Sequence, residues 1–84
     1  MLRPSPDFID LIARADLTIT ELAERTNISR FTIHKWFQQP QPASPRRRVA
    51  WRIANAYAAA AGVREEEAFK RLFVEVPTEQ PATT

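Results

Sequence analysis

A short stretch between residues 17 and 38 constrains the fold of this chain more than any other part of it. Thr18 and Glu21 have the Thr-x-x-Glu spacing of a capping box, which predicts that a helix begins at Thr18. Asn27 stands where a tight turn needs a positive φ, a conformation that asparagine tolerates better than most residues. Ser29 supplies a side-chain oxygen that caps a second helix. The stretch therefore predicts two short helices joined by a tight turn.

The apolar residues of this stretch are spaced as such a helix pair requires. The inward positions are Leu22, Ile28, Ile33 and Trp36. Ala23 lies where the two helices cross, and a larger side chain there would hold them apart. The second helix keeps an exposed, basic N-terminal half, which is the arrangement that places a helix in the major groove of double-stranded DNA.

Basic residues are concentrated in the middle of the 84-residue chain. From Thr26 to Gly62 there is no Asp or Glu, but there are six basic residues: Arg30, Lys35, Arg46, Arg47, Arg48 and Arg52. The remaining segments carry six basic and ten acidic residues, so the formal net charge is only +2. Because the cationic segment coincides with the helix pair, the charge pattern favours a polyanionic partner over a solvated basic face.

These motifs resemble the phage Cro and repressor type of helix-turn-helix regulator. The resemblance extends from Phe8 to Phe73, and its motifs are Leu17-Thr18, Glu21-Leu22-Ala23, Asn27-Ile28-Ser29, Ile33, Trp36, Ile53-Ala54-Asn55-Ala56-Tyr57 and Gly62-Val63. The chain departs from the family at Ile19, where Gln often holds a phosphate, at Asn27, where Gly is usual, and in its Pro-rich loop after Trp36. The resemblance implies an all-α, compact five-helix bundle with a helix-turn-helix at its second and third helices.

The rest of the chain predicts three further helices and no strand. Ser5 and Pro6 start the first helix, and a second Ser-Pro pair starts the fourth helix, which runs from about Pro45 to Ala61. The inward stripe expected for that helix is Val49, Ile53, Ala56, Tyr57 and Ala60. Gly62 ends it, and a fifth helix is expected from about Glu65 to Val74. We expect a loose arm at 1–4, one DNA-binding domain at 1–76 and a disordered tail at 77–84.

The second helix of the pair and the arginines after it are the candidate DNA-contacting residues. Base contacts are expected from Ser29, Arg30, Phe31 and Lys35. Phosphate contacts are expected from Thr18, Thr32, His34, Arg46, Arg47 and Arg48. Arginine is the first choice for direct recognition, because its guanidinium forms two hydrogen bonds with guanine O6 and N7. Two alternatives stay open: Phe31 belongs to the core, or the arginines form surface ion pairs with Glu21 or Glu24.

Composition argues against the other functional classes. The chain has no cysteine, one glycine and one histidine, so it offers no thiolate metal site, no Gly-rich phosphate loop and no catalytic triad. We expect neither an enzyme nor a bound cofactor or metal. No apolar run reaches the length of a membrane span and the N-terminus lacks a signal-peptide pattern, so we expect a cytoplasmic, nucleoid-associated protein without a membrane partner.

The leading hypothesis is a sequence-specific regulator of transcription, favoured as a repressor, that binds double-stranded DNA as a homodimer on a palindromic operator. A dimer surface is expected at Trp51, Phe73, Val74 and Val76. One alternative is a non-specific architectural DNA-binding protein. Another is an antitoxin-like module that binds a protein partner and also represses its own operon.

Overall fold

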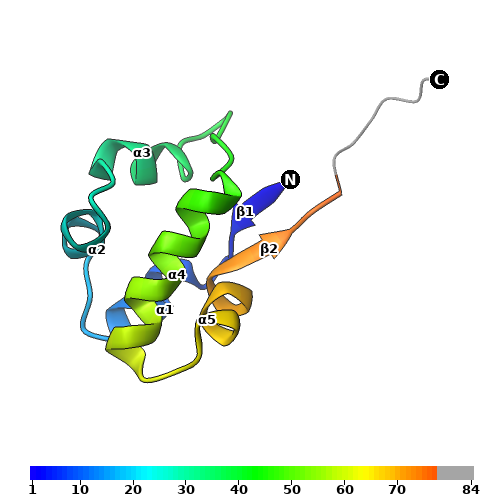
Figure 1. Cartoon of the computed structure of the whole chain (residues 1–84). Coiled ribbons are helices and arrows are strands. Elements are labelled where there is room, and N and C mark those ends of the chain that lie inside the picture. Colours follow the sequence, from blue (N-terminus) through cyan, green and yellow to red (C-terminus); the bar gives the residue numbers. More distant parts are fainter. Residues whose placement is uncertain (78–84) are drawn as a thin grey trace.

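The computed structural model describes residues 1–77, which are mostly helical and include a small antiparallel sheet (Figure 1). In chain order the elements are β1 (Leu2–Pro4), α1 (Phe8–Arg14), α2 (Ile19–Thr26), α3 (Arg30–Lys35), α4 (Arg47–Ala61), α5 (Glu65–Leu72) and β2 (Phe73–Glu75). The prediction of a mostly helical fold with five helices is therefore confirmed, whereas the expectation of no strand is wrong. Except for Pro77, the tail predicted at 77–84 lies outside the described residues.

The two strands come from opposite ends of the chain and pair with each other (Figure 1). Leu2 lies opposite Glu75, and Pro4 lies opposite Phe73. The fifth helix ends at Leu72 rather than at Val74, because Phe73 takes an extended conformation with φ −130° and ψ 148°. This conformation turns the Phe73 ring into the core, where only 3% of the residue is exposed. The arm expected at residues 1–4 is thus an ordered strand.

The helix pair α2–α3 follows the local signals of the sequence. The Glu21 N–H donates to Thr18 Oγ1 over 3.1 Å and the Thr18 N–H donates to Glu21 Oε1 over 3.0 Å, which confirms the capping box. Asn27 has φ 57° and ψ 38°, so it is left-handed as predicted. Ser29 Oγ accepts a 3.1 Å hydrogen bond from the Phe31 N–H, which confirms the second cap. Residues 27–29 alone separate the two helices.

The core lies between α4 and the other helices and has an aromatic centre. Its largest fully buried side chains are Phe8, Ile12, Leu22, Ile33, Ile53 and Leu72. The Phe8 ring lies 6.5 Å from Trp36, 5.5 Å from Phe37 and 5.7 Å from Phe73, measured between ring centroids. Phe8 therefore joins α1, the end of α3 and β2 in one cluster.

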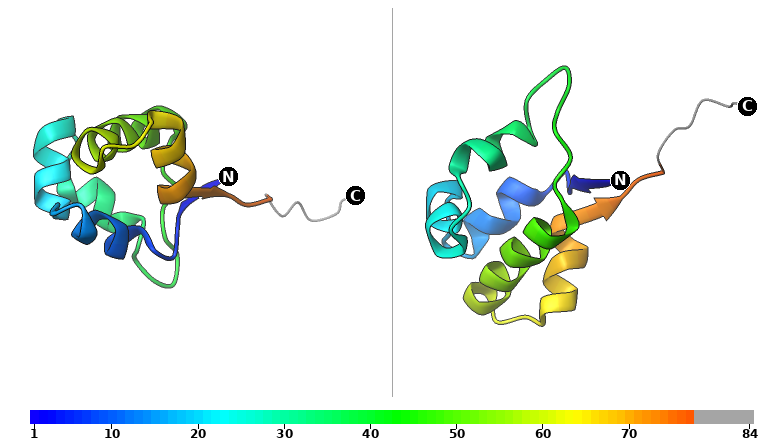
Figure 2. Two further views of the ribbon diagram at one scale, coloured as in Figure 1. Left: turned by 90° about the horizontal axis from the view of Figure 1, so that it is seen from below. Right: turned by 45° about the horizontal axis from the view of Figure 1, so that its top comes forward.

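Helix α4 begins later than the sequence predicts, and it buries Ile53 and Tyr57 as predicted but on a shifted face. It starts at Arg47 with Arg46 as N-cap, and Pro45 is buried in the preceding loop. Its buried residues are Ala50, Ile53, Ala54, Tyr57 and Ala58, whereas Ala60 is exposed. The face is shifted because α2 and α5 both pack against α4 and enclose a wide arc of it. The loop that joins α3 to α4 is the longest connection among residues 1–77 and projects from the body (Figure 2).

Candidate functional site

Most of the surface of helix α3 is exposed, and only one side of the helix packs against the core. Ile33 is fully buried and Trp36 is 3% exposed, so these two residues anchor the helix to the core. The exposed residues at its start and along its length are Ser29, Arg30, Phe31, Thr32, His34 and Lys35. Every residue predicted to contact bases therefore lies on one short, exposed segment, together with two of those predicted to contact phosphates.

Phe31 is the most exposed large apolar residue of this surface. It is 67% exposed, which rules out the alternative that it belongs to the core. The guanidinium carbon of Arg30 lies 5.4 Å from the centre of the Phe31 ring, within the range of a cation–π contact. The pair places an apolar ring and a planar cation side by side at the start of α3. Such a pair can contact both an apolar methyl group and a hydrogen-bond acceptor.

A hollow of about 330 Å³ lies between α3 and the start of α4, and we call it the α3–α4 hollow. Thr32 and Lys35 line it from α3, and Ser44 and Arg46 line it from the loop before α4. The Ala43 N–H donates to the Lys35 carbonyl oxygen over 2.9 Å and holds the loop against the helix. The fold thus brings together a cation and a hydroxyl group from each of two separate segments, with no carboxylate among the lining residues.

Arg47 points to a different part of the molecule from Arg46. Its Nη2 lies 2.6 Å from Glu75 Oε1, and its guanidinium carbon lies 6.0 Å from the centre of the Phe69 ring. The surface ion pair considered as an alternative therefore exists, but its acid is Glu75 of β2 rather than Glu21 or Glu24. Of the three consecutive arginines, Arg46 lines the α3–α4 hollow and Arg47 joins α4 to the sheet.

The carboxylate of Glu75 is held between two cations. The hydrogen bond from the N-terminal ammonium of Met1 is the main cause that lowers the pKa of Glu75, and the hydrogen bond from Arg47 is the second. The Met1 ammonium lies 3.0 Å from Glu75 Oε2. The Glu75 carboxylate on β2 therefore links the N-terminus to Arg47 at the start of α4.

Arg52 holds the helix pair rather than extending an exposed patch. Its Nη2 donates a 2.7 Å hydrogen bond to the carbonyl oxygen of Thr26, the last residue of α2. The hydroxyl group of Thr26 is buried and donates to the Leu22 carbonyl over 2.6 Å. Sequence reasoning missed the role of Arg52, because it depends on how α4 crosses α2.

The remaining candidate phosphate ligands are exposed but differ in their surroundings. The Thr18 hydroxyl accepts from the Glu21 N–H and lies 3.3 Å from Glu21 Oε1, so it already serves the capping box. Arg48 is exposed on the first turn of α4, and His34 is exposed on α3. Because the Glu21 carboxylate lies beside Thr18, it weakens the attraction of Thr18 for an anionic phosphate.

No family model, curated protein or solved structure matches this chain.

The residues predicted for a dimer surface do not form one exposed patch. Phe73 is buried in the core of the single chain, so its assignment to a partner surface is wrong. Trp51 is half-buried and stacks on Phe69, with ring centroids 4.3 Å apart and an interplanar angle of 22°. Val76 is half-buried and Val74 is 38% exposed. Only Val74 keeps the exposure that the prediction requires.

Residues 1–77 contain no group of three His, Cys, Asp or Glu residues arranged to hold a metal ion. None of the helices in this part of the chain has both the length and the apolar character needed to cross a lipid bilayer.

Proposed function

We propose that this chain is a sequence-specific DNA-binding regulator of transcription, favoured as a repressor, in which α2 and α3 form a helix-turn-helix. Helix α3 is the recognition helix and enters the major groove with its N-terminal residues toward the base edges. The protein then acts on chromosomal DNA in the cytoplasm, where it occludes a promoter.

The exposed surface of α3 is the observation that carries this proposal. A helix of a small domain normally turns its charged and apolar residues to different environments, yet Phe31 is 67% exposed beside Arg30. Arg30 matches the acceptors of guanine, and the Phe31 ring matches the methyl group of thymine. The variety of these side chains supports recognition of sequence, because a uniform row of lysines and arginines would serve phosphate binding alone.

The α3–α4 hollow supplies the phosphate contacts of the proposal. Lys35 and Arg46 place two positive charges next to the recognition surface, and Thr32 and Ser44 add hydroxyl donors. Contacts of this kind fix the orientation of a protein on the duplex without carrying sequence information. Arg48 and His34 are exposed and remain candidates for phosphate contact, whereas Arg47 is occupied by Glu75.

Recognition by one such helix covers few base pairs, so the proposal includes a homodimer on a two-fold symmetric operator. The half-sites would then be about 34 Å apart, one turn of the duplex. Val74 on β2 is the exposed apolar residue retained from the predicted surface.

Selection from a random duplex library tests the proposal, with the recovered sequences titrated at two salt concentrations. We expect a palindromic consensus that the wild type prefers over random competitor DNA. The Arg30→Ala variant should relax the preference at one position in each half-site. Arg14→Ala is the matched control, because Arg14 is exposed on α1 and paired with Asp10 at 3.2 Å.

Three other outcomes would contradict different parts of this proposal. Recovery of DNA without enrichment, steeply weakened by salt, would indicate an architectural protein. If Arg30→Ala lowered the affinity for every DNA sequence equally, Arg30 would contact phosphate only. No recovery at low salt would favour the antitoxin-like alternative, in which the helix pair binds a protein.

A further inference from the structure

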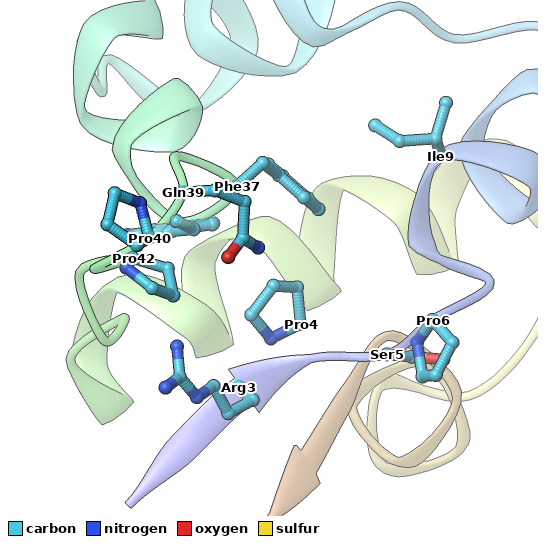
Figure 3. Close-up of a pocket in the computed structure, with 10 residues that line it drawn as sticks. Arg3, Pro4, Ser5, Pro6, Ile9, Phe37, Gln39, Pro40 and Pro42 are labelled. Atoms are coloured by element: carbon cyan, nitrogen blue, oxygen red, sulfur yellow. The ribbon is translucent and has the colours of Figure 1, made fainter.

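A second hollow lies on the side of the molecule where β1, the start of α1 and the loop at 37–42 meet (Figure 3). We call it the N-terminal groove, and its volume is about 520 Å³. Cavities that hold small molecules in proteins commonly have volumes of about 300–1,000 Å³. None of the residues assigned to DNA contact lines the groove, so the proposed function does not account for it.

Rings form most of the apolar wall of the N-terminal groove. Phe37, which is half-buried, and Trp36, which is 3% exposed, line it from the residues that follow α3. The remaining rings belong to prolines of two separate segments: Pro4, Pro6, Pro40 and Pro42. Proline has a fixed φ, so this wall loses little conformational entropy when a ligand binds. Rings on several sides favour a flat apolar ligand group, because it makes many dispersion contacts with them.

Arg3 is the only charged residue that lines the groove among residues 1–77. It is half-buried, and it takes part in no ion pair with this part of the chain. A guanidinium without an acidic partner attracts an anion, and its planar fork can hold a carboxylate by two parallel hydrogen bonds. The groove therefore favours a ligand that carries a carboxylate.

The polar and apolar groups lie in different parts of the groove. Figure 3 shows Arg3 and Ile9 at opposite ends of the hollow, with the Gln39 amide facing into the space between them. Ile9 is 48% exposed and leaves an apolar surface open at its end. The hydroxyl group of Ser5 already accepts a 3.1 Å hydrogen bond from the Asp7 N–H, so it serves the start of α1. The groove thus matches an amphipathic ligand with its anionic group at one end.

These lining residues discriminate between classes of ligand. A nucleotide or polyphosphate carries several negative charges, whereas the described part of the groove offers one cation. A neutral sugar would leave Arg3 without an anion, and a simple inorganic anion would leave the rings without a partner. A single carboxylate joined to an aromatic ring uses the guanidinium, the Gln39 amide and the ring walls together.

We propose that the N-terminal groove binds a small aromatic carboxylate. The carboxylate pairs with the Arg3 guanidinium and accepts a hydrogen bond from the Gln39 amide. The aromatic ring of the ligand lies toward Ile9, between Phe37 and the prolines. This site gives the chain a small-molecule ligand in addition to its proposed partner, and the inference does not rest on DNA binding.

The test uses the full ¹⁵N-labelled chain carrying Trp51→Phe, in which Trp36 gives the single indole N–H resonance. The probe is 4-phenylbutyrate, which joins an aromatic ring to a carboxylate through a flexible chain. We expect saturable shifts of the Trp36 indole resonance and of the Arg3 and Gln39 amides at low millimolar probe.

Two matched probes separate the interactions of the ligand. The first, 4-phenylbutyramide, keeps the ring but has no charge, and the second, butyrate, keeps the charge but has no ring. The amide should bind about tenfold more weakly than 4-phenylbutyrate, because it loses the hydrogen bonds between charged groups. Butyrate should also bind about tenfold more weakly, because it loses the burial of the ring.

Protein variants assign these interactions to residues. Arg3→Gln should remove the preference for 4-phenylbutyrate over its amide, and Ile9→Ser should weaken the binding of both about threefold. Arg64→Gln is the control, since Arg64 is exposed at the start of α5 and outside the groove. Amide resonances far from the groove should keep their wild-type positions in each variant, which shows that the fold is intact. The titrations contain no DNA, so this proposal and the proposed function fail independently.

Three results would overturn the inference. Equal binding of butyrate and 4-phenylbutyrate would show that the groove does not recognise a ring. An unchanged preference for the carboxylate over the amide in Arg3→Gln would remove Arg3 from the site. Shifts confined to residues outside the groove, or no shift at tens of millimolar probe, would show that the groove takes no ligand of this chemistry.

Discussion

The guanidinium group of Arg52 donates a 2.7 Å hydrogen bond to the main-chain carbonyl of Thr26, and it thereby fixes α4 to the end of α2. Carbonyl groups in the last turn of a helix have no partner inside that helix. A positive charge at this end is also favoured by the helix dipole. The position of the turn at 27–29, and of α3 after it, therefore depends on a side chain 26 residues further along the chain.

Replacing Arg52 tests this relationship. Arg52→Met should lower the free energy of unfolding by about 1 kcal/mol, because it removes the hydrogen bond and keeps most of the aliphatic stem. Urea unfolding measures the change. Arg48→Met is the control one helical turn earlier, and it should stay within about 0.5 kcal/mol of the wild type. Equal effects of the two variants would contradict the assigned role.

The left-handed conformation of Asn27 makes a second prediction. Asn27→Ala should destabilise the fold by about 1 kcal/mol, because a Cβ without a compensating polar group is disfavoured at φ 57°. Asn27→Gly should change stability less, since glycine relieves the strain but gives the unfolded chain more freedom. Chemical unfolding of the two variants at one temperature checks the order. An alanine variant as stable as the wild type would contradict it.

The ion pairs of Glu75 predict how stability depends on pH. Its folded-state pKa lies below the ordinary value of 4.5, first through the N-terminal ammonium and then through Arg47. Stabilisation by this carboxylate is therefore present above pH 4.5 and is lost as the pH falls through the lowered pKa. Thermal unfolding should show Glu75→Gln less stable than the wild type at neutral pH.

The difference between Glu75→Gln and the wild type should disappear in acid, below the lowered pKa. Glu67→Gln is the control, because Glu67 has only an exposed 3.4 Å pair with Arg71 on the same helix. A Glu75→Gln deficit that persists unchanged in acid would show that the carboxylate does not stabilise the fold through its charge.

Adjacent arginines at the start of α4 should behave differently if the proposed DNA binding holds. Arg46→Ala should weaken binding to every duplex and reduce the slope of log K against log salt by about 1, because it removes one phosphate contact. Arg47→Ala should leave this slope unchanged and lower thermal stability instead, because Arg47 pairs with Glu75. Titration of both variants over a range of salt checks the distinction. Equal slopes for the two variants would refute it.

The aromatic cluster around Phe8 predicts the largest loss of stability. Phe8→Ala should cost about 3–5 kcal/mol, because it opens a cavity among Trp36, Phe37 and Phe73. Domains of this size are marginally stable, so we expect circular dichroism to show a largely unfolded variant at room temperature. Ile9→Ala, at the neighbouring and 48% exposed position, should remain folded.

The helix pair could be predicted from the sequence because its signals are local. The Thr18–Glu21 capping box, Asn27 and Ser29 each act within a few residues, and all three are present in the structure as predicted. Ile33 and Trp36 also set the rotation of α3, so the exposure of Phe31 followed from the pattern. These features need no information about the rest of the chain.

The strands and ion pairs could not be predicted because they depend on distant parts of the chain. Three residues at each end are too few to show a period of two, and apolar Phe73 and Val74 continue the pattern of α5. The partner of Arg47 follows only from the position of β2, which places Glu75 beside α4. For the same reason the sequence does not reveal the hydrogen bond from Arg52 to the Thr26 carbonyl, which depends on how α4 crosses α2.

Pairing of β1 with β2 also sets the order in which the molecule assembles. The contact between Leu2 and Glu75 closes a loop that contains every helix, and the entropy cost of closure rises with the length of the loop. Helices joined by short turns form before such a distant contact becomes favourable. We therefore expect the sheet to close last during folding and to open first on heating.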